Sequence, residues 1–431
     1  MTRLTRVAAG LGSAPPVRIV HLGLGAFHRS HQAWFTARAG DDWGIAAFTG
    51  RSPAAAVPLA EQNGLFTLVE RGPDGDSAEI IGSIARAHDG RDLEALAAAI
   101  AAPTTAIVTL TITEAGYLLG PDGRLDGSDD AVIADRAALR AATRDPVRAP
   151  RPSTALGRLA MALEARRRAG AGPIAVVPCD NLPGNGRVVR EALLGLASDA
   201  PELRAYIEAE VSMVSTSVDR ITPAATDDDH ALAERLTGFV DHAPVVAEPF
   251  HDWVLAGEFP AGRPAWERAG ARFVDDIEPF ENRKLWMLNG AHTILASVGP
   301  ARGHETVASA MADATVRGLV ERFWDEASRH LAPELEADNY RDALMARFLN
   351  PRIEHRLAQI AQGAGIKVRA RILPVLQREL AAGRDASGCL AALAAWADAE
   401  GQGIDSSRLF ARVSEDFTPV VERVDALRRR R

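Results

Sequence analysis

The sequence predicts an α/β protein, with a doubly wound, mostly parallel sheet followed by a mainly α-helical C-terminal domain. In the first part of the chain, strand-like apolar runs alternate with alanine-rich helical stretches. This alternation is typical of a parallel sheet that carries helices on both faces. After about Asp276 helical patterns follow one another and strand-like segments nearly vanish. We therefore expect two domains, 1–277 and 278–431, with the boundary near Asp276–Pro279.

The individual elements follow from the apolar runs and from the turn sequences between them. The expected strands are Val17–Leu22, Gly44–Thr49, Phe66–Glu70, Ala106–Thr111, Ile174–Pro178 and Val211–Val218. Helices expected in the first domain include Asp92–Ala101 and Thr154–Ala169. Those expected in the second domain are Glu281–Val298, His304–Leu331, Tyr340–Phe348, Ile353–Gln362 and Ala370–Ala382. The turn sequences "PDG" and "PGNG", at Pro121–Gly123 and Pro183–Gly186, separate the periodic segments.

Composition excludes several classes of protein. The 431 residues are 47% hydrophobic and 25% charged, which is typical of a globular protein. A net charge of -8 and the lack of a long basic run argue against a nucleic-acid partner. Two distant cysteines, Cys179 and Cys389, predict neither a disulfide framework nor a Cys-rich zinc site, and we expect no metal. Since neither a signal peptide nor a run of 18 apolar residues is evident, we expect a cytoplasmic protein without a membrane segment.

The stretch "VHLGLGAFHRSHQ" resembles a dinucleotide-binding turn. Gly23 and Gly25 directly follow an apolar strand, but His28 replaces the third glycine of G-x-G-x-x-G. The first glycine permits a tight turn and the second lets the backbone approach a pyrophosphate, whereas the third only lets helix and strand pack closely. These residues alone leave open whether the turn binds a cofactor or is only a strand-to-helix connection. The cofactor contacts expected here are Gly23, Leu24, Gly25, Ala26, Phe27 and His28, together with Arg51, Thr113 and Glu114 farther along the chain.

A second candidate site is the sequence "NRKLWMLNGAHT" at the start of the second domain. Lys284, Asn289 and His292 are spaced i, i+5 and i+8, which on an α-helix keeps them within about 140° of the circumference. A desolvated lysine can act as a general base, an amide can stabilise an oxyanion, and a histidine can orient a hydroxyl group. The set suits oxidation of a secondary alcohol. The alternative, a surface lysine, a helix-end turn and a core histidine, also fits the spacing.

Polar residues also follow three predicted strands, where the ligands of open α/β sheets bind. They are Asp180, Asn181 and Asn185 in "PCDNLPGNG", Asp219 and Arg220 in "STSVDRITP", and Glu114 in "TLTITEAGY". Any one of them alone is more often part of a turn or a salt bridge than of a site. Together they place polar groups at one edge of one sheet.

Several motifs follow one another along the chain: "GLGAFHRSHQ", "NGLFTLVE", "TLTITEAGY", "PCDNLPGNG", "VDRITP", "EPFHDWV", "KLWMLNGAH" and "RFLNPRIEHRLAQIA". Together, in this order, they resemble the mannitol dehydrogenase family. This family comprises long-chain, zinc-independent polyol and aldonate dehydrogenases. The resemblance extends from about Ile19 to Arg371, and K-x4-N-x2-H is its most specific element. It implies a Rossmann-like first domain in which the glycine turn binds NAD. The second strand ends in "AAFTGRSP" without a carboxylate, so NADP is not excluded.

Residue roles follow from the same resemblance. It implies Lys284 as the general base and Asn289 with Asn181 as the oxyanion pair. It further implies that His292 and Asp219 hold hydroxyl groups and that Lys367 reaches the far end of the substrate.

His355, Arg356 and Gln359 match the H-R-x-x-Q pattern of an aldonate-like subgroup, whereas the following "QGAGIKVRAR" keeps Lys367 and Arg371 but loses other subgroup residues. An arginine fork suits a substrate carboxylate, so we expect Arg356 to bind one, unless it is a surface charge on an exposed helix. It can converge with Lys367 only if Gly363–Gly365 bends the chain back.

The predicted reaction interconverts an aldonate or polyol and its 2-keto product. D-mannonate and D-fructuronate are the preferred pair, and D-mannitol and D-fructose the alternative. A phosphorylated-substrate dehydrogenase would need further cations, and a catalytically silent dinucleotide sensor is the alternative of another class. The expected partner is a small sugar acid or polyol, bound by a monomer or a small homo-oligomer.

Overall fold

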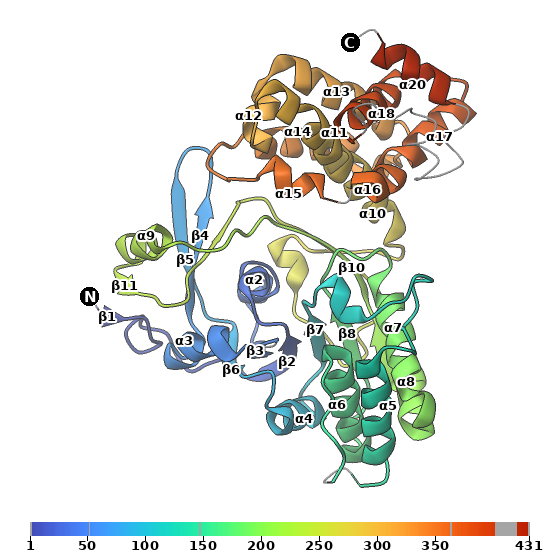
Figure 1. Ribbon diagram of the computed structural model, residues 1–431. Helices are drawn as coiled ribbons and strands as arrows, with labels where there is room; N and C mark the ends of the chain where they lie inside the picture. Colours follow the sequence, from blue (N-terminus) through green and yellow to red (C-terminus); the bar gives the residue numbers. More distant parts are fainter. Residues whose placement is uncertain (1, 51, 146–147, 363, 401–419, 430–431) are drawn as a thin grey trace. The chain divides into compact units, whose positions relative to one another are not determined.

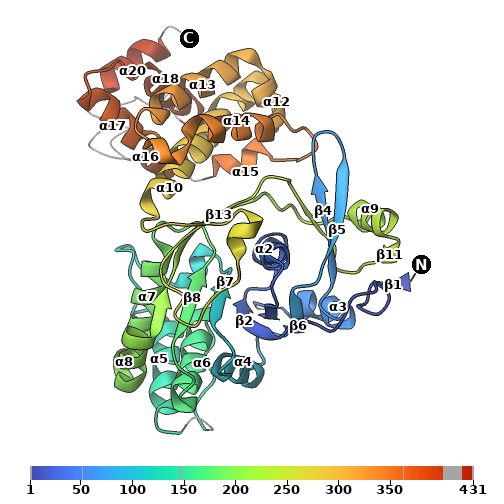
Figure 2. The same cartoon turned by 180° about the vertical axis from the view of Figure 1, so that it is seen from behind.

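The computed structural model describes residues 2–50, 52–145, 148–362, 364–400 and 420–429. The chain folds as two compact units, Met1–Ile277 (unit 1) and Glu278–Arg431 (unit 2). Figures 1 and 2 show that strands and helices are mixed in unit 1, whereas unit 2 is built of helices. The α/β fold class with a helical C-terminal part is confirmed.

The centre of unit 1 is a six-stranded sheet in which every pair of neighbours is parallel. Across the sheet the strands are β6 (Ile84–His88), β3 (Gly44–Phe48), β2 (Val17–Leu22), β7 (Ile107–Leu110), β8 (Ile174–Pro178) and β9 (Val211–Met213). In chain order within this sheet, the arrangement is 3-2-1-4-5-6, the order of dinucleotide-binding doubly wound folds. The order reverses between β2 and β7, so a ligand crevice is expected at the carboxyl ends of these strands.

Both faces of this sheet are buried, because apolar side chains point in both directions. Ile19 and Ile107 belong to one core cluster, and their chain neighbours Val20 and Val108 belong to another. Near-continuous apolar strands of this kind are typical of parallel sheets covered by helices on both faces.

Helices of unit 1 begin at capping residues that the sequence supplies. Asp92, Asp129 and Thr154 accept backbone N–H groups at the starts of α4 (Leu93–Ala101), α5 (Asp130–Ala142) and α6 (Ala155–Ala169). Figures 1 and 2 place these helices beside α7 (Asn185–Leu196) and α8 (Pro201–Glu210) on one side of the sheet. The short helices α1 (Ala26–His28), α2 (Trp34–Ala39) and α3 (Ala56–Glu61) lie in the first two crossovers.

Two expected strands belong to other sheets than predicted. Phe66–Glu70 forms β4 (Phe66–Arg71), which pairs as an antiparallel hairpin with β5 (Asp76–Ile81) and in parallel with β12 (Val245–Ala247). The hairpin turn, closed by the Gly72 N–H donating to Gly75 O at 2.9 Å, was not recognised in the sequence. Phe66–Glu70 is therefore a strand, as expected, but it lies outside the main parallel sheet.

The expected strand Val211–Val218 is divided into two strands, which belong to different sheets. After β9 the chain leaves the main sheet at Val214, and β10 (Ser215–Asp219) pairs antiparallel with β13 (Asp252–Ala256). The break lies where Gly186 packs closely, since a Cβ on this glycine would stand 2.8 Å from the Ser215 nitrogen. The smaller elements of unit 1 are β1 (Thr2–Arg3), α9 (Asp227–Thr237), β11 (Phe239–Val240) and β14 (Arg272–Phe273).

Unit 2 is a helical assembly around the buried helix α11. Its helices include α10 (Glu278–Arg283), the π-helix η6 (Lys284–Gly290), α11 (Ala291–Val298), α12 (Val307–Ala312), α13 (Ala314–Ser328), α14 (Ala337–Phe348), α15 (Leu357–Ala361), α16 (Ala364–Arg371), α17 (Leu373–Ala381), α18 (Ser387–Glu400) and α20 (Val421–Arg428).

Several helices of unit 2 are shorter than predicted. His304–Leu331 is not one helix, because Asp313 ends α12 and its carboxylate accepts the Thr315 N–H at 2.8 Å to begin α13. Helix α15 begins only after Arg356, whose backbone is extended and bridges to Thr306. These breaks come from side-chain caps and from pairing with distant segments, which apolar periodicity does not report.

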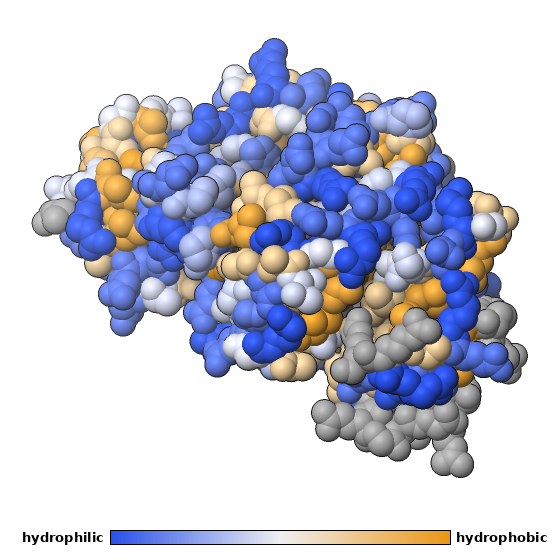
Figure 3. Space-filling model, turned by 90° about the horizontal axis from the view of Figure 1, so that it is seen from above, coloured by the Kyte–Doolittle hydropathy of each residue, from blue (hydrophilic) through white to orange (hydrophobic). Residues whose placement is uncertain are grey.

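The visible surface is mostly polar. In Figure 3 hydrophilic residues cover most of the face shown, and apolar residues form separate patches. Within the described part of the chain, no helix is long and apolar enough to cross a membrane.

Candidate functional site

The glycine turn after β2 has a conformation that only glycine adopts easily. Gly23 has φ +110°, and a Cβ there would lie 2.1 Å from the carbonyl oxygen of Thr111. The N–H groups of Gly23 and Leu24 both donate to Phe48 O at 2.9 Å, which ties the turn to the end of β3. Gly25 precedes α1 and has an extended backbone, with φ -146° and ψ -169°. The turn therefore joins the carboxyl ends of β2, β3 and β7.

A cavity of about 770 Å³ opens at these strand ends. Leu22 and Phe48, the last residues of β2 and β3, line it together with Thr111, which follows β7. The other lining residues are Gly23, Thr49, Gly50, Gly90, Leu96, Ile112, Thr113, Ala115, Gly116, Leu118, Ala131, Ser153, Thr154, Ala155 and Arg158. An elongated dinucleotide fits this lining, because glycines and small side chains let the ligand approach the backbone at the switch point of the sheet.

The expected cofactor contacts lie around this cavity to different extents. Gly23 and Thr113 line it, and Glu114 begins a short 3-10 helix, η3 (Glu114–Tyr117), directly after Thr113. Arg51 lies outside the described residues. The remaining expected contacts, which belong to the turn and α1, do not line the cavity: Leu24, Gly25, Ala26, Phe27 and His28. Thr49, Gly90 and Arg158 were missed because they come from segments far apart in the sequence.

His28, which replaces the third glycine, packs beneath the turn. Its ring stacks on His21 at 3.4 Å with an interplanar angle of 9°. Burial lowers the pKa of His28 well below its ordinary value, and proximity to His21 lowers it further. Burial likewise lowers the pKa of His21 to about 3, although its ring nitrogens contact the Thr109 and Thr111 hydroxyls at 2.8 and 3.1 Å. Both rings are neutral at pH 7, and they are fully buried against each other.

The polar group after β8 has a buried part and an exposed part. Asn185 is buried, donates to Thr216 O at 3.0 Å and accepts the Thr216 N–H at 2.8 Å, so it fastens α7 to β10. The buried Tyr117 hydroxyl hydrogen-bonds to Asp180. Asn181, the expected oxyanion residue, is exposed. Of the three residues expected at this sheet edge, Asp180 and Asn185 are therefore buried and hydrogen-bonded within the fold, whereas Asn181 lies at the surface.

Asp219 is the last residue of β10 and Arg220 directly follows it; both are buried. The Arg220 side chain is fully buried, where it donates to Ser30 O at 2.6 Å and pairs with Glu70 at 2.5 Å. These contacts make Arg220 structural. Asp219, the expected hydroxyl-binding residue, is 9% exposed at the end of the strand.

The K-x4-N-x2-H residues of unit 2 lie on one continuous helical segment that is not a regular α-helix. Lys284–Gly290 forms a π-helix between α10 and α11. Because a π-helix closes its turns at i+5, it brings Lys284 and Asn289 closer to one face than the α-helical spacing predicted. Both side chains are half-buried, and His292, in the first turn of α11, is 7% exposed.

His292 has an orphaned polar atom and a basic environment. Its Nε2 is buried and has no hydrogen-bond partner in the described part of the structure. Burial lowers the pKa of His292 well below its ordinary value, and His355, Arg347, Arg371 and Lys367 lower it further. The ring of His355 stands edge-on at 4.8 Å. The largest electrostatic influences on this imidazole therefore all come from basic groups, of which Arg347 was not expected from the sequence.

The cations expected at the far end of the substrate differ in burial. Arg371 is largely buried, which lowers its pKa to about 10, and it donates to Asn289 O at 3.2 Å and to the Thr293 hydroxyl at 3.1 Å. Lys367 donates to Ile360 O at 2.8 Å. Arg356 is 57% exposed and pairs with Glu354 at 2.5 Å. Arg356 thus lies in an extended surface segment before α15, not on the helix that was predicted.

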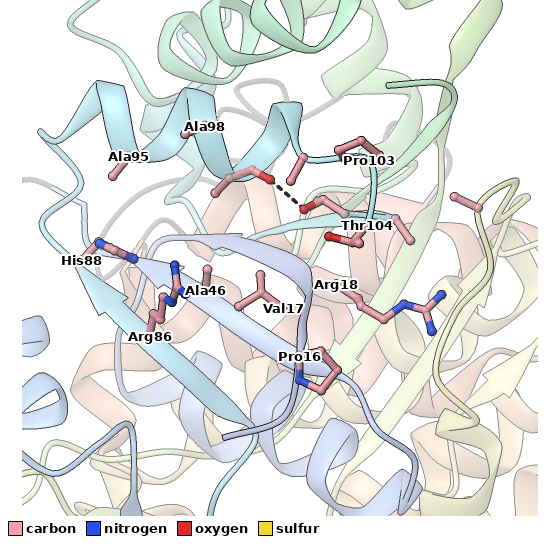
Figure 4. A pocket seen from close by; sticks show the side chains of 15 residues that line it. Pro16, Val17, Arg18, Ala46, Arg86, His88, Ala95, Ala98, Pro103 and Thr104 are labelled. Carbon is pink, nitrogen blue, oxygen red and sulfur yellow. Dashed lines mark hydrogen bonds between the residues drawn. The ribbon is translucent and has the colours of Figure 1, made fainter. Parts of the chain in front are cut away.

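A second cavity of unit 1, of about 680 Å³, lies between α4 and the sheet (Figure 4). Val17 and Arg18 begin β2, and Ala106 directly precedes β7. Since ligands of open α/β sheets bind at the carboxyl ends of the strands, this position does not fit a cofactor.

Comparison with protein families matches both units. A model described as the mannitol dehydrogenase Rossmann domain matches residues 17–268, and one described as the mannitol dehydrogenase C-terminal domain matches residues 276–410. The chain belongs to the mannitol dehydrogenase family. The resemblance noted in the motifs is thereby confirmed, and so is the cofactor, NAD. Like other members of the mannitol dehydrogenase family, the chain is an NAD-dependent dehydrogenase that acts on CH–OH groups.

Relatives within the mannitol dehydrogenase family have different names. An uncharacterized oxidoreductase of Escherichia coli (strain K12), YeiQ, is 40% identical over 83% of this chain and 73% of its own length. The D-mannonate oxidoreductase of the same strain is 36% identical over 90% of this chain and 82% of its own. The structure of Pseudomonas fluorescens mannitol 2-dehydrogenase with NAD and D-mannitol is 32% identical, with a TM-score of 0.78, and covers 99% of this chain and 93% of its own.

Proposed function

We propose that this dehydrogenase interconverts D-mannonate and D-fructuronate without a metal, and that D-mannitol and D-fructose are its second pair. The observation that supports an acidic substrate is the environment of His292, where Arg347, Arg371 and Lys367 all contribute positive charge. A carboxylate is stabilised by such a group of cations more strongly than a neutral polyol, which offers them only hydroxyl dipoles. The name of the D-mannonate oxidoreductase relative agrees with this choice. The D-mannitol complex of the other relative supports the second pair.

Lys284 is proposed as the general base. The chain has 49 lysine and arginine residues, and only two of them, Lys284 and Lys367, are lysines. Arginine supplies a permanent charge but cannot release a proton in proteins, whereas a lysine amine can. Nearly all basic residues of this chain are arginines. A lysine at position 284 therefore suits a position where the proposed reaction needs an amine that can be neutral. The half-buried position in the π-helix supports this role, since desolvation favours the neutral form.

The other residues of the set orient the reacting group. We propose that the unpaired Nε2 of His292 binds the substrate hydroxyl, since an unsatisfied buried nitrogen costs about 1–3 kcal/mol that such a contact recovers. The Asn289 and Asn181 amides are proposed to stabilise the developing oxyanion, and Asp219 to hold a second hydroxyl. NAD, when bound, accepts the hydride from the carbinol carbon. Lys284 takes the hydroxyl proton in the same oxidation.

Two lysine variants test the base. Lys284→Arg keeps the charge and approximate length but replaces an amine that can be neutral with a group that stays protonated and cannot accept a proton, so kcat should fall roughly 10²–10⁴-fold. Lys367→Arg changes the only other lysine, which is expected at the far end of the substrate; because it keeps the charge and is not the proposed base, it should change KM and not kcat. NADH binding, followed by fluorescence titration, should be unchanged in both. Near-normal turnover of Lys284→Arg with the best substrate would remove lysine from the mechanism.

A panel of substrates tests whether D-mannonate and D-fructuronate are the preferred pair. Mannonate, fructuronate, mannitol, fructose, arabinitol and sorbitol should be assayed with NAD(H), before and after prolonged chelation. We expect the highest kcat/KM for mannonate and fructuronate, and no loss on chelation. Arg356→Ala should raise KM for fructuronate far more than for fructose if this arginine binds the carboxylate. More efficient oxidation of mannitol than of mannonate by the unmutated enzyme would assign the chain to the polyol dehydrogenases.

A further inference from the structure

The cofactor cavity differs from that of a strictly NAD-selective fold at the end of β3. In such folds a carboxylate about 20 residues after the glycine turn binds the 2′-hydroxyl of the adenosine ribose. Here β3 ends at Phe48 and continues into Thr49 and Gly50, which line the cavity. Among the described residues that line this cavity there is no carboxylate, and the charged side chain is that of Arg158. The group that would reject a 2′-phosphate is therefore missing from this lining.

Arg158 comes from the first turn of α6 and is held at the tip of β3. Its Nη1 donates to Gly90 O at 2.6 Å and to Gly50 O at 3.4 Å, and its Nε donates to Thr154 O at 3.3 Å. Gly90 itself packs against the end of β3, since a Cβ there would lie 1.8 Å from the Thr49 oxygen. Nη2 of Arg158 has no hydrogen-bond partner within the described ranges. The guanidinium is thus fixed on one side and has donors available on the other.

Two carboxylates act on Arg158 electrostatically, and both are already engaged by other groups. Asp89 pairs with Arg91 at 2.7 Å. Asp135 accepts the Thr154 hydroxyl at 2.6 Å and the backbone N–H groups of Ser153 and Thr154 at 2.8 and 3.1 Å. Neither carboxylate makes a hydrogen bond to the guanidinium. A phosphate therefore does not have to displace an existing ion pair to reach Arg158.

We propose that Arg158 determines cofactor selectivity by binding the 2′-phosphate of NADP(H), so that this enzyme accepts both NAD and NADP. A guanidinium with two free N–H groups matches a phosphate in geometry and charge. With NAD the same arginine loses nothing, because its contacts to Gly50 and Gly90 remain. The inference rests on the dinucleotide cavity of the proposed enzyme, but not on its substrate or on Lys284.

Binding of two nucleotide fragments tests the proposal without any turnover. Isothermal titration calorimetry with 2′,5′-ADP and 5′-AMP compares ligands that differ only in the 2′-phosphate. We expect the unmutated protein to bind 2′,5′-ADP at least as tightly as 5′-AMP. Arg158→Ala should weaken 2′,5′-ADP about tenfold or more, in line with the loss of charge-assisted hydrogen bonds, and leave 5′-AMP within about threefold. NADPH and NADH fluorescence titrations should show the same difference.

Two further variants keep the outcome interpretable. Arg158→Gln retains a donor for Gly90 O but removes the charge, so it should lose 2′,5′-ADP affinity while unfolding at the same temperature as the unmutated protein. Arg204→Ala, on α8 and 46% exposed, is the matched control and should bind both fragments normally. The proposal is overturned if the unmutated protein does not bind 2′,5′-ADP, or if the Arg158 variants weaken both fragments equally. Failure of the lysine or substrate tests would leave these binding results unaffected.

Discussion

The two glycines of the cofactor turn should respond differently to alanine. Gly23 has φ +110°, and an added Cβ would lie 2.1 Å from Thr111 O and 2.8 Å from Thr111 C. Those atoms belong to the backbone and cannot rotate away. A positive φ costs a non-glycine residue about 1–2 kcal/mol, and overpacking against fixed atoms costs about 1–3 kcal/mol more. Gly23→Ala should therefore lower the free energy of unfolding of unit 1 by roughly 2–5 kcal/mol.

Gly25 is the matched control within the same turn. Its backbone is extended, and a Cβ there would contact only Gly23 O, at 3.6 Å. Gly25→Ala should leave stability within about 0.5 kcal/mol of the unmutated protein. It should nevertheless weaken NADH binding about tenfold, or 1.4 kcal/mol, because the second glycine lets the backbone approach the pyrophosphate.

Thermal unfolding and NADH fluorescence titration separate the two effects. At about 2–4 °C per kcal/mol for a domain of this size class, Gly23→Ala should lower the Tm by roughly 4 °C or more. Gly25→Ala should unfold at the normal temperature. Equal destabilisation by both substitutions, or a normal Tm for Gly23→Ala, would refute the geometric reasoning.

Two further predictions concern stability. Asn185→Ala removes the paired hydrogen bonds to the Thr216 backbone and leaves buried groups unsatisfied, so chemical denaturation should show a loss of about 1–3 kcal/mol. Asn181→Ala, at an exposed residue, should leave stability intact but lower kcat, and a stability loss equal to that of Asn185→Ala would contradict this assignment. Burial depresses the pKa values of His21, His28 and His31, so the unfolded chain binds protons near pH 6.5 that the folded chain does not. The free energy of unfolding should consequently be highest above pH 6.5 and decline as the pH falls toward 4, by up to about 1.4 kcal/mol per pH unit for each histidine. If the free energy of unfolding in urea does not change between pH 7 and 5, these rings are not buried as neutral groups.

Local patterns in the sequence were sufficient to predict the class of the fold and to indicate which residues are candidates for the site. The strands β2, β3, β7 and β8 are apolar runs that stay apolar because both faces of a parallel sheet are covered. Asp92 and Thr154 begin their helices by capping, as expected of these residue types. The glycine turn and the K-x4-N-x2-H spacing could be recognised as candidates because each consists of residues that are close together in the sequence.

What only the tertiary structure decided involves residues far apart in the chain. Period-two patterning indicates that Phe66–Glu70 is a strand but not which strand it pairs with, and it pairs with β5 and β12. The π-helix at Lys284–Gly290 changes which side chains share a face, and no propensity scale distinguishes it from an α-helix. Asn185 and Asn181 are chemically identical in the sequence, yet the packing of α7 against β10 buries Asn185, whereas Asn181 is exposed. Arg158 reaches the tip of β3 from a helix more than a hundred residues later, because hydrogen bonds to Gly50 and Gly90 fix it there. Burial and long-range pairing depend on the whole fold, so a local pattern cannot specify them.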